Sequence, residues 1–241
     1  MHAAPHVSLS AQLTLERRLT TLALNVANMN TVGYRATGVN FHELVSRTGN
    51  DPVAFVSGGR DYITRTHGPL IQTGNPLDIA VQGEGWLAVQ TPRGTVYTRD
   101  GRMRMQPNGA LQTVDGYAVL DAGGAPILLD PDGGTPTIAG DGMITQGGRQ
   151  VGAIGLYEID PKANFTRFEN SGVIPDKPAT PVLDFTSNGI VQRSVEGSNV
   201  NPVMEMAKLM MISRAFESVT GGTSSNESTL KDAIKILGGA S

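Results

Sequence analysis

The chain has 241 residues, a formal net charge of −3 and no cysteine. Weak acidity without a block of basic residues argues against a nucleic-acid-binding surface, and the lack of Cys excludes disulfides, thiolate metal sites and cysteine nucleophiles. Only 39% of the residues are apolar and Gly is abundant, which favours many turns and short strands over a large α/β enzyme.

The N-terminal segment carries apolar residues at alternating steps of four and three. They are Leu15, Leu19, Leu22, Val26 and Met29. This heptad spacing is typical of a helix that packs against another helix in coiled-coil fashion. Asn30 and Gly33 then supply a helix stop, because Gly accepts the left-handed conformation that ends many helices. The sequence therefore predicts an N-terminal helical domain over residues 1–35.

The same segment superficially resembles a targeting signal. Arg17 and Arg18 precede the stretch LTTLALNVA, as in a twin-arginine leader. However, Thr20, Thr21 and Asn25 interrupt the apolar run, so we expect neither a cleaved leader nor a membrane span.

Residues 36–74 give no clear pattern and are interpreted as a connecting segment, with Gly58-Gly59 and Gly68-Pro69 marking loops. Residues 75–195 follow a different pattern, in which Asn-Gly and Asp-Gly pairs recur between pieces of strand length such as WLAVQ, TVYTR, ALQTV and PILLD. These pairs accept the positive φ angles of tight hairpin turns. We therefore expect an antiparallel, mainly-β domain over 75–195.

No constellation of residues predicts catalysis or cofactor binding. Residues 83–88 match G-x-G-x-x-A, but Pro92 follows too soon for the helix that a dinucleotide site needs, so we interpret the motif as a turn between strands. Asp130-Pro131-Asp132-Gly133 lacks the further ligands of a calcium loop and is also interpreted as a turn. The four histidines are dispersed, and we expect no metal, no cofactor and no catalytic residue.

The C-terminal segment, 196–241, again shows helical spacing, in Leu209, Ile212, Phe216 and Val219. Pro202 suits the first turn of this helix, with Asn199 or Asn201 as its cap. Gly221-Gly222 is expected to weaken or break the helix, at about 1 kcal/mol per Gly. The whole chain is thus predicted to be α+β, with the two terminal helices pairing as a coiled-coil-like layer beside the β domain.

Residues 19–34 contain no charge, even on the face away from the apolar stripe. Asn and Thr can be desolvated with less penalty than an unpaired charge, so we interpret this face, like the two stripes, as a surface between subunits. The predicted assembly interface comprises Leu15, Leu19, Leu22, Asn25, Val26, Asn28, Met29, Leu209, Ile212, Phe216 and Val219.

Three separated stretches resemble the signatures of the flagellar rod and hook family. They are NVANMNTVGYR at 25–35, TGNPLDIAVQGEGW at 73–86 continued by YTRDG at 97–101, and EGSNV at 196–200 followed by 204–206 and 214–217. The residues that carry the match include Asn30, Thr31, Gly33, Tyr34, Asn75, Pro76, Leu77, Asp78, Gly83, Gly85, Tyr97, Thr98, Arg99, Gly101, Ser198, Asn199, Val200, Glu205, Met206 and Arg214.

The resemblance implies a structural subunit of a periplasmic rod that stacks helically with copies of itself and with other rod proteins. It also implies export through the flagellar type III apparatus without a cleaved leader. Length and the opening segment look most like a proximal-rod subunit, with a distal-rod or hook subunit as the alternative. A β-rich ligand-binding protein with a helical oligomerisation stalk is a further alternative, and an enzyme has no residues to support it.

Overall fold

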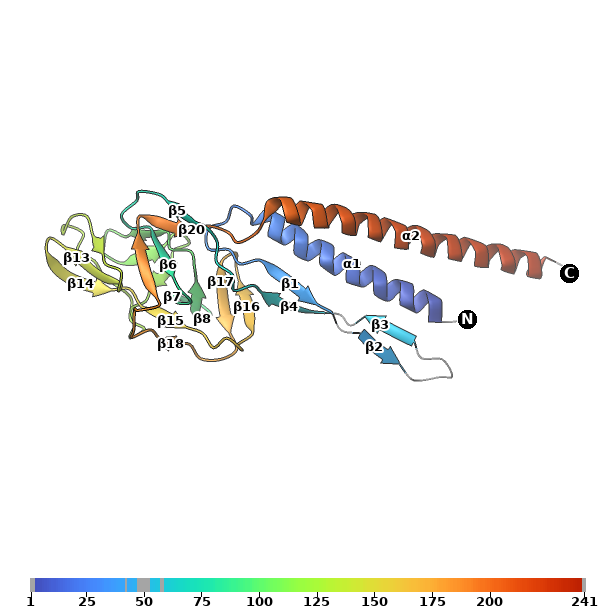
Figure 1. Cartoon of the computed structure of the whole chain (residues 1–241), viewed down its shortest axis with the longest axis horizontal. Coiled ribbons are helices and arrows are strands. Elements are labelled where there is room, and N and C mark those ends of the chain that lie inside the picture. The colour runs from blue at the N-terminus through green and yellow to red at the C-terminus, as the bar shows by residue number, and fades with distance from the viewer. Residues whose placement is uncertain (1–2, 42, 47–52, 57–58, 240–241) are drawn as a thin grey trace. The chain divides into compact units, whose positions relative to one another are not determined.

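A computed structural model describes residues 3–41, 43–46, 53–56 and 59–239 and divides the chain into two compact units (Figure 1). Unit 1 comprises Met1–Ala27, Thr37–Tyr62 and Asn201–Ser241, and unit 2 comprises Asn28–Ala36 and Ile63–Val200. The predicted scheme of 1–35, 36–74, 75–195 and 196–241 runs in sequence order, whereas these units interleave along the chain. The units are defined by contacts between segments that are far apart in the sequence. Such contacts cannot be predicted from a local sequence pattern.

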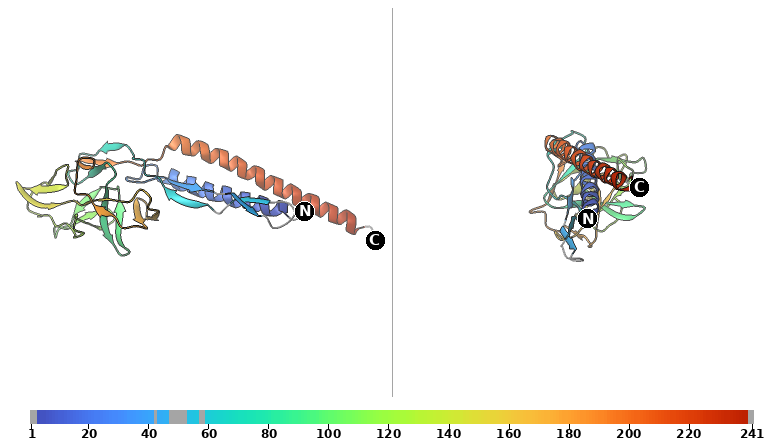
Figure 2. Two further views of the ribbon diagram at one scale, coloured as in Figure 1. Left: turned by 60° about the horizontal axis from the view of Figure 1, so that its bottom comes forward. Right: turned by 90° about the vertical axis from the view of Figure 1, so that its right-hand side faces the viewer.

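Unit 1 contains both helices, α1 (Ala3–Ala27) and α2 (Pro202–Gly238), which contact each other (Figures 1 and 2). Gln12 Nε2 lies 3.5 Å from Thr220 Oγ1, and Asn25 Nδ2 lies 3.1 Å from Glu205 Oε2. Because the order of these contacts is reversed along the two helices, α1 and α2 run antiparallel. The α+β class and the two helices are confirmed, while coiled-coil geometry stays a prediction.

Helix α1 is shorter than predicted, because it ends at Ala27 and the chain then turns through Asn28, Met29 and Asn30. The apolar stripe thus continues in the helix only as far as Val26. The turn is stabilised locally, since Thr31 N donates to Asn28 O at 3.1 Å and Thr31 Oγ1 donates to Asn28 Oδ1 at 3.0 Å. Asn and Thr side chains commonly replace helical hydrogen bonds in this way.

Helix α2 begins as predicted, with Asn201 as its cap: Met204 N donates to Asn201 Oδ1 at 3.1 Å and Pro202 occupies the first turn. The expected weakening at Gly221-Gly222 does not break the helix, which continues through both residues to Gly238. Intrinsic propensity is a weak determinant of structure that the flanking helical turns and tertiary contacts can outweigh.

Replacing Gly221 and Gly222 with Ala is expected to stabilise α2 by up to about 1 kcal/mol per site. An added Cβ at either position would meet nothing within 4 Å. Thermal unfolding followed by circular dichroism at the helical band measures the effect. Gly109→Ala is the control that should destabilise the chain, since its φ is +85° and its Cβ would strike Leu129 O. A loss of helix in the Gly221/Gly222 variant would contradict the expectation.

The connecting segment also belongs largely to unit 1 and forms a paired β ribbon that the sequence did not predict. Strand β1 (Thr37–Asn40) pairs with β4 (Arg60–Ile63), and β2 (Glu43–Ser46) pairs antiparallel with β3 (Val53–Val56). The ribbon is tied to α1, since Arg17 forms an ion pair with Asp61 at 3.1 Å and the Arg18 guanidinium lies 4.8 Å from the centre of the Phe41 ring. Gly58 of the predicted loop lies outside the described residues.

Unit 2 is the predicted antiparallel β domain. Its main sheet has nine strands, with β16-β17-β8-β7-β11-β10-β9 in order and β15 and β18 attached through β7. Smaller sheets are β12-β13-β14, β19-β6 and β20-β5. The bounds are β5 Leu70–Gln72, β6 Ile79–Gln82, β7 Trp86–Thr91, β8 Gly94–Thr98, β9 Met103–Met105, β10 Leu111–Thr113, β11 Ala118–Val119, β12 Thr137–Ile138, β13 Met143–Gln146, β14 Arg149–Ala153, β15 Leu156–Glu158, β16 Phe165–Phe168, β17 Gly172–Pro175, β18 Thr180–Pro181, β19 Gly189–Gln192 and β20 Ser194–Glu196.

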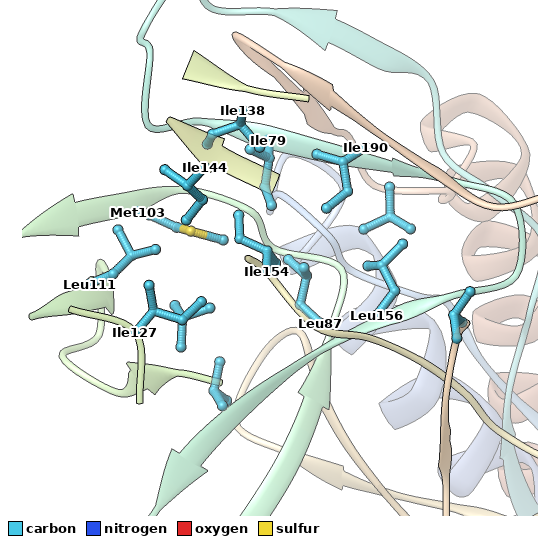
Figure 3. Packing of buried hydrophobic residues seen from close by; sticks show 14 of the residues in the cluster. Ile79, Leu87, Met103, Leu111, Ile127, Ile138, Ile144, Ile154, Leu156 and Ile190 are labelled. Atoms are coloured by element: carbon cyan, nitrogen blue, oxygen red, sulfur yellow. The ribbon is translucent and has the colours of Figure 1, made fainter. Parts of the chain in front are cut away.

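The core of unit 2 is built from alternate residues of these strands, including Ile79, Leu87, Met103, Ile144 and Leu156 (Figure 3). Turns at Gly83, Gly109, Gly116 and Gly142 have positive φ and join the strands. Residues 83–85 of the G-x-G-x-x-A stretch connect β6 to β7, and its last three residues belong to β7 instead of a helix. The Asp130-Pro131-Asp132-Gly133 turn is confirmed, since Gly133 N donates to Asp130 O at 3.1 Å. The piece PILLD forms only isolated bridges, through Pro126 and Leu128.

Candidate functional site

Charged residues from all three signature stretches meet in one buried cluster of unit 2. Glu196 Oε1 lies 2.6 Å from Arg35 Nη2, and Glu196 Oε2 lies 3.1 Å from Arg99 Nη1. All three side chains are at most 2% exposed. Together with Trp86 and His67 they form what we call the junction cluster. A buried carboxylate shared by two guanidiniums is stable only when nearly every polar atom finds a partner.

Backbone carbonyls supply further partners for the arginines. Arg99 donates to Val81 O at 3.1 Å and to Gly83 O at 2.6 Å, and Arg35 Nη1 donates to Thr66 O. Nε of both Arg35 and Arg99 is buried without a hydrogen-bond partner. Burial lowers the pKa of Arg99 to about 10, against the opposing effect of Glu196, and it lowers the pKa of Arg35 in the same way. Removal of Glu196 would therefore leave two poorly solvated cations.

Aromatic and imidazole groups complete the junction cluster. The centre of the Trp86 ring lies 5.3 Å from the guanidinium carbon of Arg99 and 5.8 Å from that of Arg35. These are cation–π distances. His67 Nδ1 lies 3.1 Å from Arg35 Nη2, and His67 Nε2 lies 3.2 Å from Glu84 Oε1. Because Arg35 is a donor, Nδ1 accepts and we assign the imidazole hydrogen to Nε2.

Asn199 joins the chain segments around the junction cluster. Its Oδ1 accepts from Ala36 N at 2.7 Å, its Nδ2 donates to Thr64 Oγ1 at 2.8 Å, and its N donates to Tyr34 O at 3.3 Å. Asn199 was one of two candidates for the cap of α2, and the structure gives it this different task. The chain passes between the two units after residues 27, 36, 62 and 200. Asn199 and its partners Tyr34, Ala36 and Thr64 all lie within two residues of one of these passages. The hydrogen bonds of Asn199 therefore hold these segments of unit 2 together.

Close approach of backbones explains two glycines here. Gly33, with a φ of +69°, would direct a Cβ into the backbone of Asp100, and its N donates to Glu196 O at 2.7 Å. Gly68 would direct a Cβ into Gly197 O, and its N donates to Glu196 Oε1 at 2.9 Å. Only residues without a side chain fit these contacts.

The other signature residues of unit 2 have local structural tasks. Asn75 Nδ2 donates to Asp78 Oδ1 at 2.8 Å in the Asn75-Pro76-Leu77-Asp78 turn before β6. Thr98 Oγ1 accepts from Asp100 N at 3.0 Å, next to Gly101. Ser198 Oγ accepts from Val200 N at 3.2 Å, Tyr34 is buried, and the Tyr97 ring packs edge-on to Tyr157 at 5.6 Å. Gly85 N donates to Asn188 Oδ1 at 3.0 Å.

The predicted interface residues of unit 1 fall into two groups. Leu15, Leu19 and Val26 of α1 and Leu209, Ile212, Phe216 and Val219 of α2 are half-buried, and Leu22 is buried. In contrast, Asn25 is only 3% exposed and bonds within the chain, to Thr37 N and O at 2.9 Å and to Glu205 Oε2. Asn25 thus joins α1, β1 and α2 of one subunit, and its contact with a neighbouring subunit stays a prediction. The other two predicted residues, Asn28 and Met29, lie in the turn after α1 and belong to unit 2, and their part in the interface stays a prediction.

The two helical threonines of the uncharged stretch are satisfied inside α1. Thr20 Oγ1 donates to Glu16 O at 3.0 Å and Thr21 Oγ1 donates to Arg17 O at 3.0 Å. A hydroxyl that bonds back to the preceding turn needs no partner from outside. The missing charges therefore do not by themselves require a polar contact between subunits.

In the sequence, Arg35 and Glu196 stand only as parts of motifs, and neither their pairing nor the contacts of His67 and Trp86 were predicted. The one signal in the sequence was that Arg35 and Glu196 are the single charged residues of NVANMNTVGYR and EGSNV. Glu205 and Arg214, also from the signature, lie on α2, where Glu205 is buried and bonds Lys208 Nζ at 2.7 Å, while Arg214 and Met206 are exposed.

Comparisons with known proteins agree with the three signatures. Family models match residues 6–35 (flagella basal body rod protein), 80–146 (flagellar hook protein FlgE/F/G D1 domain) and 191–236 (flagellar basal body rod FlgEFG protein C-terminal). Relatives described as flagellar basal-body rod protein FlgF are 52% identical in Mesorhizobium japonicum and 44% in Rhizobium meliloti, each over 100% of both chains. Another, from Caulobacter vibrioides, is 37% identical over 99% of both chains.

Proposed function

Because this chain belongs to the family of flagellar basal-body rod proteins and is a structural subunit rather than an enzyme, we propose that it builds the rod by packing its helices against those of neighbouring subunits. The observation that carries this proposal is that α1 and α2 contact each other and yet both keep exposed apolar side chains on other faces. Exposed apolar patches on a subunit mark surfaces that another protein covers.

On α1, Leu9 and Leu13 are more than half exposed. An α-helix rotates by about 100° per residue, so Leu9 and Leu13 lie on the same side of α1 as Glu16 and Thr20. This side is about a third of a turn away from the stripe of Leu15, Leu19 and Leu22. Only Glu16 brings a charge to this side. One side of α1 thus serves α2 of the same chain, and another is available to a different subunit.

On α2, five exposed apolar residues lie in the first three turns, where at about 100° per residue they spread over about half of the helix circumference, away from Ile212 and Phe216. We call them the methionine face, and they are Val203, Met204, Met206, Met210 and Met211. The charged residues between Val203 and Met211 are Glu205 and Lys208, which pair with each other. An exposed face of α1 in one copy and the methionine face of another can form a heterologous contact, which propagates into an open helical assembly instead of closing.

Membership of the family places the chain in the flagellar basal body. Its expected partners are copies of itself and other rod proteins. We further propose a position in the proximal, periplasmic part of the rod, which the relatives described as FlgF support. Export through the flagellar type III apparatus, without a cleaved leader, belongs to the same proposal. Among the described residues no helix is both long and apolar enough to span a bilayer.

An in-frame deletion in the bacterium that encodes the chain tests the function. We expect non-motile cells whose basal bodies lack hook and filament in electron micrographs, with both restored by the gene on a plasmid. Restoration by the plasmid separates loss of the protein from damage to neighbouring genes. Swimming cells with complete basal bodies would overturn the proposal.

The alternative of a ligand-binding protein finds no support in unit 2. A hollow of about 80 Å³ lies among Asp100, Asp115, Tyr117, Phe168 and Glu169. Small-molecule sites usually enclose about 300–1,000 Å³ and are largely apolar. A ligand-binding protein would use the two helices only as an oligomerisation stalk. Rod assembly explains better why both helices expose apolar side chains.

A further inference from the structure

Four of the nine methionines of the chain are exposed within the first three turns of a single helix, α2. The exposed fractions are 56% for Met204, 46% for Met206, 56% for Met210 and 62% for Met211. By contrast, Met103 is 4% exposed in the core of unit 2. Reaction of a thioether with a dissolved oxidant depends on its exposure, so these four residues should differ sharply from Met103 in reactivity.

The side chains around these sulfurs are mostly apolar. Between Val203 and Met211 the exposed side chains of α2 are aliphatic or thioether groups apart from Lys208, because Glu205 is buried and bonds Asn25 of α1. Leu would serve equally well for helix formation and for apolar contact, since Leu and Met have similar helix propensity. Met adds a deformable side chain that adapts to different partners, together with a sulfur that can be oxidised.

We propose that the methionine face of α2 is a site of reversible oxidation by two-electron oxidants of the peroxide class, and that sulfoxide formation there blocks assembly. In the reaction the thioether sulfur attacks one peroxide oxygen, an S–O bond forms while the O–O bond breaks, and water leaves. The sulfur is oxidised to a sulfoxide and the peroxide is reduced. Methionine sulfoxide reductases reverse the change with electrons from thiols.

The effect on assembly rests on the proposed function, whereas the reactivity of the sulfurs does not. A sulfoxide is polar, so four of them turn an apolar helix face into one that must be desolvated at a cost when another subunit covers it. Oxidation would act on subunits that have not yet assembled, because packing against a neighbour covers the sulfurs.

The first measurement tests reactivity on the purified full chain. Hydrogen peroxide is added, and peptide mass spectrometry follows each methionine over time. Met204, Met206, Met210 and Met211 should oxidise at least about tenfold faster than Met103. Equal rates at the five positions would overturn the proposed site.

The second measurement uses two matched variants in the deletion strain, in which all four methionines become Leu or all four become Gln. Leu keeps the face apolar and cannot be oxidised, and Gln imitates the polarity of the sulfoxide; both are good helix formers. The Leu variant should restore motility and should keep doing so when subunits meet peroxide before assembly, while the wild type loses motility. The Gln variant should fail to restore it.

Met143→Gln, at a half-exposed position of unit 2, is the control and should restore motility fully. A Gln variant that builds rods as well as the wild type, or a Leu variant that fails, would overturn the switch. If the proposed function is wrong, the deletion strain itself will build complete rods. That result does not depend on the methionine variants, so the two failures can be told apart.

Discussion

Glu196→Gln is expected to destabilise unit 2 by about 3–5 kcal/mol, because it removes the only carboxylate that pairs with Arg35 and Arg99 in the described structure. The substitution conserves shape and still offers an acceptor to Gly68 N. It leaves two cations at most 2% exposed, each with a buried Nε that already lacks a partner. Truncating one member of a buried ion cluster costs more than the cluster contributed, since the remaining charge is no longer compensated.

Trp86 makes this measurement specific, because it is the single Trp of the chain and lies against both arginines. Urea unfolding followed by its fluorescence should show a lower midpoint for Glu196→Gln. Asp160→Asn breaks the exposed pair of Asp160 with Lys177 and should leave the midpoint nearly unchanged. If Glu196→Gln unfolds at the same urea concentration as the wild type, the junction cluster does not stabilise unit 2.

Leu22→Asp is expected to prevent incorporation into the rod while unit 2 stays folded. Leu22 is the most buried member of the α1 stripe, at 8% exposed, and lies in the helix that packs on α2. Losing a buried leucine side chain costs about 2–5 kcal/mol, and placing a carboxylate there adds the free-energy cost of removing a charge from water. The antiparallel packing of α1 and α2 should therefore be lost.

Two readouts separate the units in this experiment. Immunoblots of purified basal bodies from the deletion strain report incorporation, and Trp86 fluorescence of the purified variant reports unit 2. The control is Leu183→Asp, because Leu183 is 87% exposed in unit 2 and should tolerate the charge in both assays. Normal incorporation of Leu22→Asp would show that the stripe is not needed for assembly.

Residues near one another in sequence were enough to predict the kinds of element. Heptad spacing predicted both helices, and Asn-Gly and Asp-Gly pairs predicted the turns between short strands, because helix period and positive φ are local properties. The ribbon of β1 to β4 was missed for the same reason. Its strands are four residues long and their pairing joins segments that no short turn signature links.

The α+β class, the two terminal helices, the antiparallel strands and the family signatures could therefore be predicted from local patterns. What the signature residues do became visible in the folded chain, where Arg35 pairs with Glu196, Asn25 is buried between α1, β1 and α2, and α2 continues through Gly221 and Gly222. These outcomes depend on contacts between residues far apart in the chain, whose free energy exceeds local propensity and leaves no periodic trace in the sequence.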